Sequence, residues 1–361
     1  MIRFNPLYWE ATMRFYTQQH RFYCGVDLHA RTLALCVLDA TGQVVARLTV
    51  SAAPQAVLDA LAPFRDDLAL ACECMFAWYW LADLCQEQKI PFVLGHALYM
   101  KAIHGGKAKN DKIDAEKIAR LLRGGNLPIA YVYPRAMRAT RDLLRRRTFL
   151  VRHRAHLLAH VVNTNSQYNL PPLTKKLSYA ANRAELDVAA RFADPSVRQA
   201  VEADQARVDA SDEQIRALEL YLTRTAKVDD PQAYQRLRSI PGVGPVLALV
   251  LLYEIHDIRR FPSAGDFLSY ARLVRCAHES AGKKKGSGGN KIGNAHLKWA
   301  FSEATCLFLR DSEPARKWLA RREKKRGKAR ALGAFAARLG RAVFHLLRKQ
   351  EAFDVTRFFA S

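Results

Sequence analysis

The chain has 361 residues, half of them hydrophobic, so it is too long for one ordinary core and predicts two or three domains. Its 57 lysines and arginines outnumber its 34 aspartates and glutamates and leave a formal charge of +23, which predicts a polyanionic partner, with nucleic acid as the first candidate. The sequence has no run of about 18 uncharged apolar residues, and its first 20 residues lack the apolar core of a signal peptide. We therefore expect no membrane partner and a cytoplasmic location.

The first part of the chain alternates between predicted strands and helices. Residues 22–39 predict two strands separated by the polar turn DLHART, and the tight turn ATGQ leads into a third strand. The elements expected next are a helix over 51–67, a buried strand over 68–74, a helix over 75–88, a strand over 91–97 and a helix that begins at the N-cap Asn110. This order is typical of the ribonuclease H-like fold.

Four acidic residues fall where this fold would bring them together. Asp27 lies near the end of the first strand and Glu73 near the end of the fourth, and these strands are neighbours in a ribonuclease H-like sheet. Asp111 and Asp114 are three residues apart on the last helix, so they share one of its faces. Like charges this close are unfavourable unless a cation lies between them, and Mg²⁺ or Mn²⁺ prefers such oxygen ligands. The alternative is that the carboxylates are solvated partners of neighbouring lysines.

The middle of the chain predicts an extended helical hairpin. Residues 135–167 form a strongly basic helical pattern and residues 197–228 a second one of mixed charge, both with apolar residues at three-and-four spacing. Such a pair can form a coiled coil that dimerises. The cluster Arg145, Arg146 and Arg147 predicts contact with nucleic acid, or else a solvated helix face.

A third, mainly helical part begins near residue 233. Its motif IPGVG, followed by an apolar helix, fits a helix-hairpin-helix turn in which Gly242 and Gly244 let backbone amides approach a DNA phosphate, although a plain tight turn would give the same pattern. A loop rich in glycine and lysine follows, and a basic helical stretch ends the chain. The lysines that we expect to contact phosphate, in this loop and before Asn110, are Lys107, Lys109, Lys283, Lys284, Lys285 and Lys291.

Five segments carry a resemblance to a known family. In order and spacing, YCGVDLHARTLALCVLD, CECMFAWYWLADL, KNDKIDAEKIARLL, IPGVGPVLALVL and ESAGKKKGSGGNKIGNAHLKWAFSEA resemble the IS110 family of transposases, the DEDD group. The resemblance implies a RuvC-like catalytic domain whose four acids match Asp27, Glu73, Asp111 and Asp114, and a bound Mg²⁺. It also implies a C-terminal domain with a nucleophilic serine, assembly as a dimer or tetramer on donor and target DNA, and recognition of that DNA through a non-coding guide RNA.

Pattern and resemblance together give a division of the chain. The expected parts are an N-terminal extension (1–20), the RuvC-like domain (21–125), a helical coiled-coil segment (126–232), the C-terminal transposase domain (233–345) and a tail (346–361).

The serine of the family matches Ser280 best. The family pattern often has a second serine beside it, where this chain has Ala281, and Ser287 lies on the same loop. Both Ser280 and Ser287 therefore remain candidates for the nucleophile.

The sequence is best interpreted as a transposase that cuts and rejoins DNA through a metal-bound acid cluster and a serine nucleophile. Two alternatives use fewer of these features. A RuvC-type nuclease would need only the acids, the metal and water, and a non-catalytic nucleic-acid-binding protein would need only the basic surface.

Overall fold

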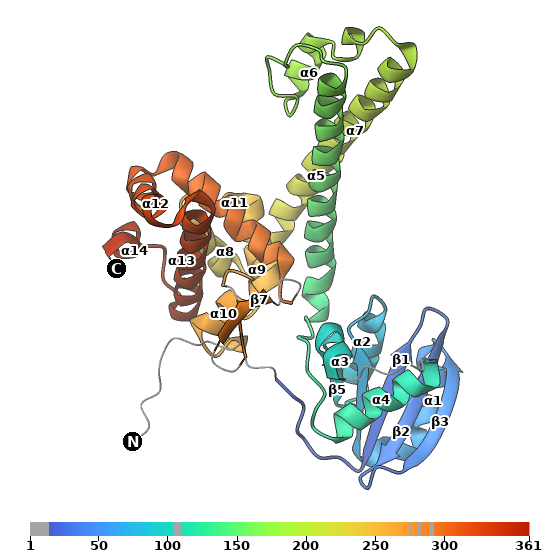
Figure 1. Ribbon diagram of the computed structural model, residues 1–361. Helices are drawn as coiled ribbons and strands as arrows, with labels where there is room; N and C mark the ends of the chain where they lie inside the picture. Colours follow the sequence, from blue (N-terminus) through green and yellow to red (C-terminus); the bar gives the residue numbers. More distant parts are fainter. Residues whose placement is uncertain (1–13, 104–109, 275, 281–282, 289–291, 361) are drawn as a thin grey trace. The chain divides into compact units, whose positions relative to one another are not determined.

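The computed structural model describes residues 14–103, 110–274, 276–280, 283–288 and 292–360 (Figure 1). Lys107, Lys109 and Lys291, three of the predicted phosphate contacts, lie outside these ranges. By its internal contacts the chain divides into two compact units, Met1–Ala136 and Met137–Ser361. The sequence interpretation divides the second of these stretches further, at residues 232 and 345.

Unit 1 is built on a mixed five-stranded sheet. Its strands are β1 (Phe22–Leu28), β2 (Thr32–Asp39), β3 (Val44–Ser51), β4 (Leu68–Glu73) and β5 (Phe92–Gly95). They lie in the order β3-β2-β1-β4-β5; β2 is antiparallel to both β1 and β3, whereas β4 is parallel to both β1 and β5. The prediction that the first and fourth strands are neighbours is confirmed.

Alternating side chains divide the core of unit 1 between the two faces of the sheet. Cys24 of β1 and Cys72 of β4 pack on one face with α1 (Pro54–Leu61) and α2 (Trp78–Glu87). Tyr23 and Ala71 point to the opposite face, where α4 (Asp111–Arg123) packs. The remaining helical segments of unit 1 are η1 (Ala62–Asp67) and α3 (Ala97–Ile103).

Unit 2 contains a long helical hairpin. Helix α5 (Arg135–Gln167) lies beside α7 (Pro195–Asp229), with α6 (Ala180–Leu186) and η2 (Ala189–Arg191) near the far end (Figure 1). Two ion pairs, Arg147–Glu219 and Arg154–Asp212, and a hydrogen bond between His160 and Asp204 connect the long helices in antiparallel register. This is the predicted helical hairpin. Its dimerisation stays a prediction.

The rest of unit 2 is a helical bundle around one hydrophobic core. Its elements are α8 (Pro231–Arg238), α9 (Pro245–Ile255), η3 (Ile258–Arg260), α10 (Ala264–Tyr270), β6 (Cys276–Ser280), β7 (Lys283–Gly288), α11 (Ala295–Asp311), α12 (Glu313–Arg326), α13 (Lys328–Lys349) and α14 (Val355–Ala360). Apart from Glu254, helix α9 is apolar on all sides because it lies inside this bundle, where nine consecutive residues, Leu247–Ile255, are buried.

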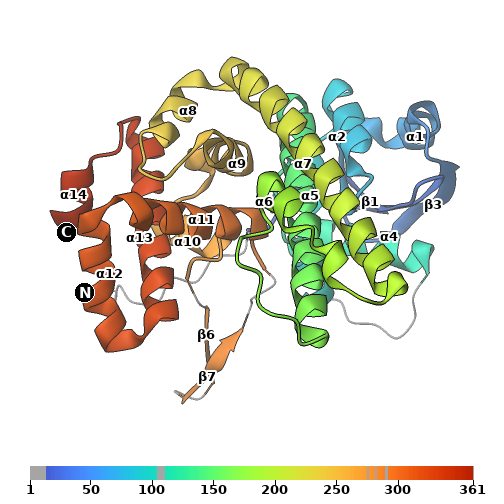
Figure 2. The ribbon, with the colours of Figure 1, turned by 90° about the horizontal axis from the view of Figure 1, so that it is seen from above.

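Two features of unit 2 differ from the sequence interpretation. The segment expected as a glycine- and lysine-rich loop contains an antiparallel two-stranded hairpin, β6–β7, which extends away from the neighbouring helices (Figure 2). The segment 346–361, expected as a tail, continues α13 and then places Phe358 in the core. Among the described residues, none of the helices combines the length and the apolar character needed to span a bilayer.

Candidate functional site

Asp27 and Glu73 lie side by side on one face of the sheet. The parallel register pairs Val26 of β1 with Cys72 of β4, and each acid is the next residue along its strand. Val26 and Cys72 point to the face covered by α1 and α2. Because side chains alternate, Asp27 and Glu73 belong to the face covered by α4.

Helix α4 brings Asp111 and Asp114 to this face. Asn110 is its N-cap, as predicted, and the Asn110 side chain accepts a hydrogen bond of 2.8 Å from the Ile113 amide. The two aspartates therefore occupy the first turn, where the helix dipole favours negative charge.

Gly25 allows the close contact between α4 and β1. A Cβ atom at this position would lie 2.1 Å from the Ala115 carbonyl oxygen and 2.4 Å from the Ala119 amide nitrogen. Only a residue without a side chain leaves room for the helix there. Since Gly25 and Asp27 are two residues apart on one strand, the contact also fixes the first turn of α4 relative to Asp27.

His29 joins the acids at this point. Its Nε2 atom lies 3.3 Å from Asp27 Oδ2 and 3.5 Å from Asp111 Oδ1. One potential ligand atom from each of these three residues lies within 4.8 Å of the other two. The Asp27 side chain is 22% exposed and the Asp111 side chain 64% exposed, so the cluster is open to solvent on one side.

Electrostatics at this site disfavour the charged form of Asp27. Burial raises the pKa of the Asp27 carboxyl, and the negative charges of Asp111 and Asp114 raise it further. The charge of His29 and its hydrogen bond lower this pKa, but the net shift is upward. A cation among these oxygens would relieve the repulsion.

The structure gathers part of the predicted site and adds one residue to it. Asp27 and Asp111 approach each other directly, whereas Asp114 forms an ion pair of 3.1 Å with Lys117 while still acting on Asp27 through its charge. Glu73 is partly buried at the end of β4. His29 is absent from the sequence prediction. The spacing Asp27-x-His29, which places both residues on one face at the end of a strand, is the signal that could have identified it.

The donor set suits a hard divalent ion. Carboxylate oxygens are typical ligands of Mg²⁺ and Mn²⁺, and the imidazole would favour a transition metal such as Mn²⁺. The residues present therefore fit such an ion.

Two of the three arginines in the predicted cluster, Arg145 and Arg147, form ion pairs within unit 2. The Arg145 Nε atom donates to Glu254 Oε1 at 2.6 Å, and the Arg147 Nε atom donates to Glu219 Oε1 at 2.9 Å. Arg146 is exposed, and its guanidinium lies 5.4 Å from the centre of the Phe149 ring. Of the three, Arg146 is the side chain best placed to meet an external phosphate.

Glu254 is the centre of a buried polar cluster. It accepts hydrogen bonds from Arg141 at 3.0 Å, from Arg145, and from the Asn294 side-chain amide at 2.7 Å. Burial alone would raise the pKa of Glu254, but the hydrogen bond from Arg145 and the charges of Arg141 and Arg145 outweigh it and lower the pKa to about 2. The cluster ties α5 to α9 and to the start of α11.

This cluster also anchors the segment that follows the β6–β7 hairpin. Asn294 caps α11 by accepting hydrogen bonds from the His296 and Leu297 amides. Arg272 donates to the Ile292 carbonyl at 2.9 Å. Both ends of the hairpin segment therefore join well-packed structure.

Within the hairpin the two candidate serines differ in position. Ser280 is the last residue of β6 and pairs with Lys283, near the turn, whereas Ser287 pairs with Ala277 closer to the base. Lys283, Lys284 and Lys285 lie consecutively on β7.

The IPGVG motif forms a turn between α8 and α9. Gly242 has φ +79°, and a Cβ atom there would lie 2.4 Å from the Phe308 amide nitrogen, so packing against α11 already requires glycine. Gly244 is the N-cap of α9. An open groove of about 400 Å³ borders the turn, with Arg238 and Arg310 among its lining residues. The amides at the N-terminus of α9 and these arginines offer positive charge to a phosphate.

Comparison with known proteins gives matches in both units. A DEDD-type IS110 transposase model matches residues 24–168, a range that includes all four predicted acids. A second model, described as the transposase IS116/IS110/IS902 family, matches residues 234–319, which include the β6–β7 hairpin.

Three relatives agree with these models. The transposase for insertion sequence element IS1111A of Coxiella burnetii is 25% identical over 334 residues, which cover 91% of this chain and 90% of the relative. A probable family 20 transposase of Pseudomonas aeruginosa is 25% identical over 76% of this chain and 80% of its own length. A putative transposase of Sinorhizobium fredii is 26% identical over 68% of this chain and 64% of its own length. The chain belongs to the IS110 family of transposases.

Proposed function

We propose that this transposase cuts and rejoins DNA with two sets of residues, an acid cluster that binds a divalent cation and a serine nucleophile. The observation that carries the proposal is the convergence of Asp27, Asp111 and His29 where α4 crosses β1. Glu73 and Asp114 complete the proposed cluster. The strand order β3-β2-β1-β4-β5, with an antiparallel β2 and a parallel β4, supports a ribonuclease H-like, RuvC-type assignment for unit 1.

The acids would hold Mg²⁺, or Mn²⁺ in its place. A cation bound there would polarise the scissile phosphate and stabilise negative charge on its oxygens. The protein would contribute the orientation of the ligands, since Gly25 fixes α4 on the strand and His29 lies between the two aspartates.

Ser280 is the proposed nucleophile. Its hydroxyl oxygen forms a bond to phosphorus while the bond from phosphorus to one deoxyribose oxygen breaks. The serine proton passes to a base, and the leaving oxygen takes up a proton. Attack by the hydroxyl of another DNA end reverses these changes and frees the serine. A serine hydroxyl needs activation for this step, and the acid cluster of the same or another subunit is the proposed source.

Partners follow from the charge and from the family. The net charge of +23 supports binding to donor and target DNA. We propose that a non-coding guide RNA selects these sites by base pairing, so that the protein holds duplexes mainly through their backbones. Assembly as a dimer or tetramer and action in the cytoplasm complete the proposal.

The decisive experiment is a search for a covalent protein–DNA adduct on a denaturing gel. The full-length protein, purified with its RNA, is incubated with Mg²⁺ and DNA that spans the ends of the element, beside the variants Ser280→Ala and Ser287→Ala. We expect an adduct with wild type and Ser287→Ala and none with Ser280→Ala. An adduct that persists in Ser280→Ala but not in Ser287→Ala would move the nucleophile to Ser287.

One alternative has a specific observation in its favour. The acid cluster lies entirely within unit 1, so it could activate water without the serine hairpin, as in a RuvC-type nuclease. Nicked DNA without any adduct in the same gel would favour that alternative and contradict the serine mechanism.

A further inference from the structure

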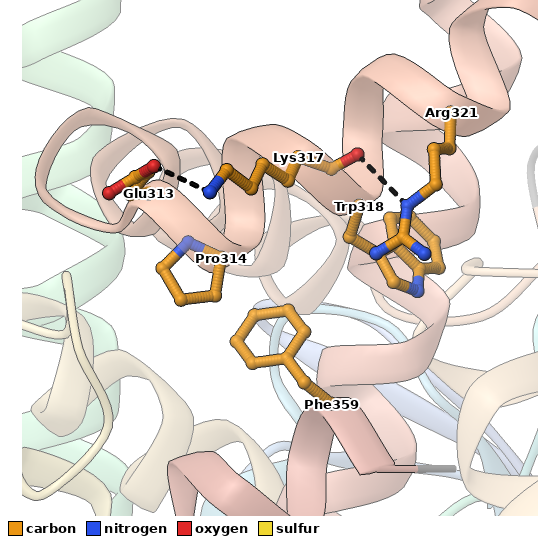
Figure 3. Close-up of a pocket in the computed structure, with 6 residues that line it drawn as sticks. All are labelled: Glu313, Pro314, Lys317, Trp318, Arg321 and Phe359. Atoms are coloured by element: carbon orange, nitrogen blue, oxygen red, sulfur yellow. Dashed lines mark hydrogen bonds and ion pairs between the residues drawn. The ribbon is translucent and has the colours of Figure 1, made fainter.

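A small pocket in unit 2 lies apart from the IPGVG turn and from the β6–β7 hairpin in sequence. It is formed by Glu313, Pro314, Lys317, Trp318 and Arg321 of α12 and by Phe359 of α14, and it has a volume of about 230 Å³ (Figure 3). Nothing in the proposed strand chemistry uses it.

Two aromatic rings, those of Trp318 and Phe359, line the pocket and pack against other aromatic rings. Trp318 is partly buried, and its ring meets the Phe335 ring edge to face at 5.4 Å between centroids. Phe359 is likewise partly buried, and its ring meets the Phe358 ring edge to face with 4.9 Å between the centroids. The Pro314 ring lies beside Phe359 in Figure 3. Arg322 lies 4.5 Å from the centre of the Trp318 ring and covers one of its faces, so Phe359 is the main ring surface that the pocket offers to a flat ligand.

The rim of the pocket is basic. Lys317 and Arg321 are one helical turn apart on α12, both are exposed, and the Arg321 Nε atom donates to the Lys317 carbonyl at 3.4 Å (Figure 3). The sequence of α12, EPARKWLARREKKR, contains seven lysines and arginines against two glutamates. Aromatic surface beside a basic stripe is the arrangement with which proteins bind single-stranded nucleic acid, by stacking bases and neutralising phosphates.

Glu313 gives this rim a hydrogen-bond acceptor beside its basic side chains. Its carboxylate forms a 2.7 Å ion pair with Lys317 and is 66% exposed, so it can also accept a hydrogen bond from solvent or ligand. A ribose 2′-hydroxyl is a donor that deoxyribose lacks. The bases of duplex DNA are paired and stacked, whereas RNA loops present unpaired bases to aromatic side chains.

We propose that this pocket binds an unpaired nucleobase of a single-stranded RNA, with Phe359 against the base, Trp318 at the edge of the base, and Lys317 and Arg321 at the adjoining phosphates. The inference rests on the proposed RNA partner and adds a site for it on unit 2.

The test measures binding of short fluorescein-labelled oligoadenylates, as RNA and as DNA, and of a duplex DNA, by fluorescence anisotropy at physiological salt. The full-length protein is stripped of nucleic acid and kept in a chelator. Phe359→Leu keeps apolar packing but removes the aromatic face, and it should weaken RNA binding about tenfold. Phe359→Tyr should bind within about twofold of wild type. Tyr168→Leu is the matched control, because Tyr168 is 49% exposed, directly follows α5 and lies outside the pocket.

Lys317→Gln is a second variant that alters no packing, since Lys317 is 70% exposed. It should weaken RNA binding. It should also reduce the slope of log affinity against log salt concentration by the amount expected for about one lost phosphate contact. For the first variant, Phe359→Leu, the affinity for duplex DNA should equal that of wild type.

Several results would overturn the inference. These are unchanged RNA binding in both Phe359→Leu and Lys317→Gln, an equal loss in Tyr168→Leu, or an equal loss for duplex DNA. If Phe359→Leu lost as much affinity for the DNA oligoadenylate as for the RNA oligoadenylate, RNA would be rejected as the preferred ligand. The adduct experiment tests the strand chemistry separately: the pocket can bind RNA when no adduct forms, and an adduct can form when Phe359→Leu binds RNA normally.

Discussion

Asp27 of unit 1 and Glu254 of unit 2 are both carboxylates inside the protein, but their surroundings are opposite. Asp27 has two further aspartates nearby and a raised pKa. Glu254 has two arginines and an asparagine within hydrogen-bonding distance, and its pKa falls to about 2. The protein supplies the positive charge for Glu254 in full, whereas at Asp27 it leaves negative charges close together.

This difference separates a structural site from a functional one. A buried carboxylate with complete ion pairing holds helices in place, and removal of either partner is costly. A cluster of acids with a perturbed pKa lowers the stability of the fold and is typical of a site that acts on something else. Substitutions at the two carboxylates should therefore have opposite effects on activity and stability.

The largest effect is expected from Asp27→Asn. Loss of this charge should lower the rate of DNA strand cleavage at least about 10³-fold, equivalent to about 4 kcal/mol, because a ligand of the proposed cation is lost. The stability of the folded protein should not fall, since a repelled charge is removed. Cleavage kinetics and urea unfolding measure the two quantities, and strand cleavage at the wild-type rate would contradict the metal-site hypothesis.

Glu254→Ala should have the opposite profile. It leaves the buried Arg141 and the partly buried Arg145 without their carboxylate, so unit 2 should lose about 3–5 kcal/mol of stability in urea unfolding. Glu351→Ala is a matched control, because Glu351 is 56% exposed in its ion pair with Arg357 and should change stability by less than about 1 kcal/mol. Equal effects of the two substitutions would show that the Glu254 cluster is not structural.

Acid should weaken unit 2 through the same residue. The folded-state pKa of Glu254, about 2, lies below the ordinary value of 4.5. Its contribution is therefore fully present above about pH 4.5 and is lost as the pH falls toward 2, by about 3 kcal/mol in all. Urea unfolding as a function of pH should show this loss in wild type and a smaller one in Glu254→Gln.

Gly25→Ala tests how unit 1 positions its acids. The added methyl group would meet the backbone of α4, so we expect a loss of about 1–3 kcal/mol in stability and slower strand cleavage as Asp111 moves from Asp27. Gly333→Ala is the control, because a Cβ atom at Gly333 in α13 has nothing within 4 Å and should raise stability by about 0.5–1 kcal/mol. Unimpaired cleavage by Gly25→Ala would mean that the close contact does not position the acids.

The sequence predicts much of unit 1 because its signals are local. Continuous apolar runs locate β2 and β4, and Asn110 marks the start of α4. The structure extends β1 through Leu28, so that the turn begins at His29 rather than at Asp27. Helix α3 differs from the sequence prediction, which has no helix there, since its seven residues follow directly on β5.

The missed features depend on residues far apart in the chain. Glu254 and Arg145 are 109 positions apart, so neither the ion pair nor the engagement of the predicted arginine cluster can be read from spacing. The β6–β7 hairpin is rich in glycine and lysine, which have low strand propensity, and only its cross-strand pairing reveals it. His29 becomes a candidate ligand only when α4 brings Asp111 to it.

Binding of Mn²⁺ to the full-length protein without nucleic acid, followed by electron paramagnetic resonance, tests the proposed cation site without any DNA chemistry. Wild type should bind Mn²⁺, and Asp27→Asn and Asp111→Asn should each bind it at least about tenfold more weakly. Asp66→Asn is the control, because Asp66 is an acid of unit 1 that is 87% exposed, and it should bind Mn²⁺ as wild type does. Equal Mn²⁺ affinity in all four proteins would contradict the claim that the acids at β1 and α4 form a cation site.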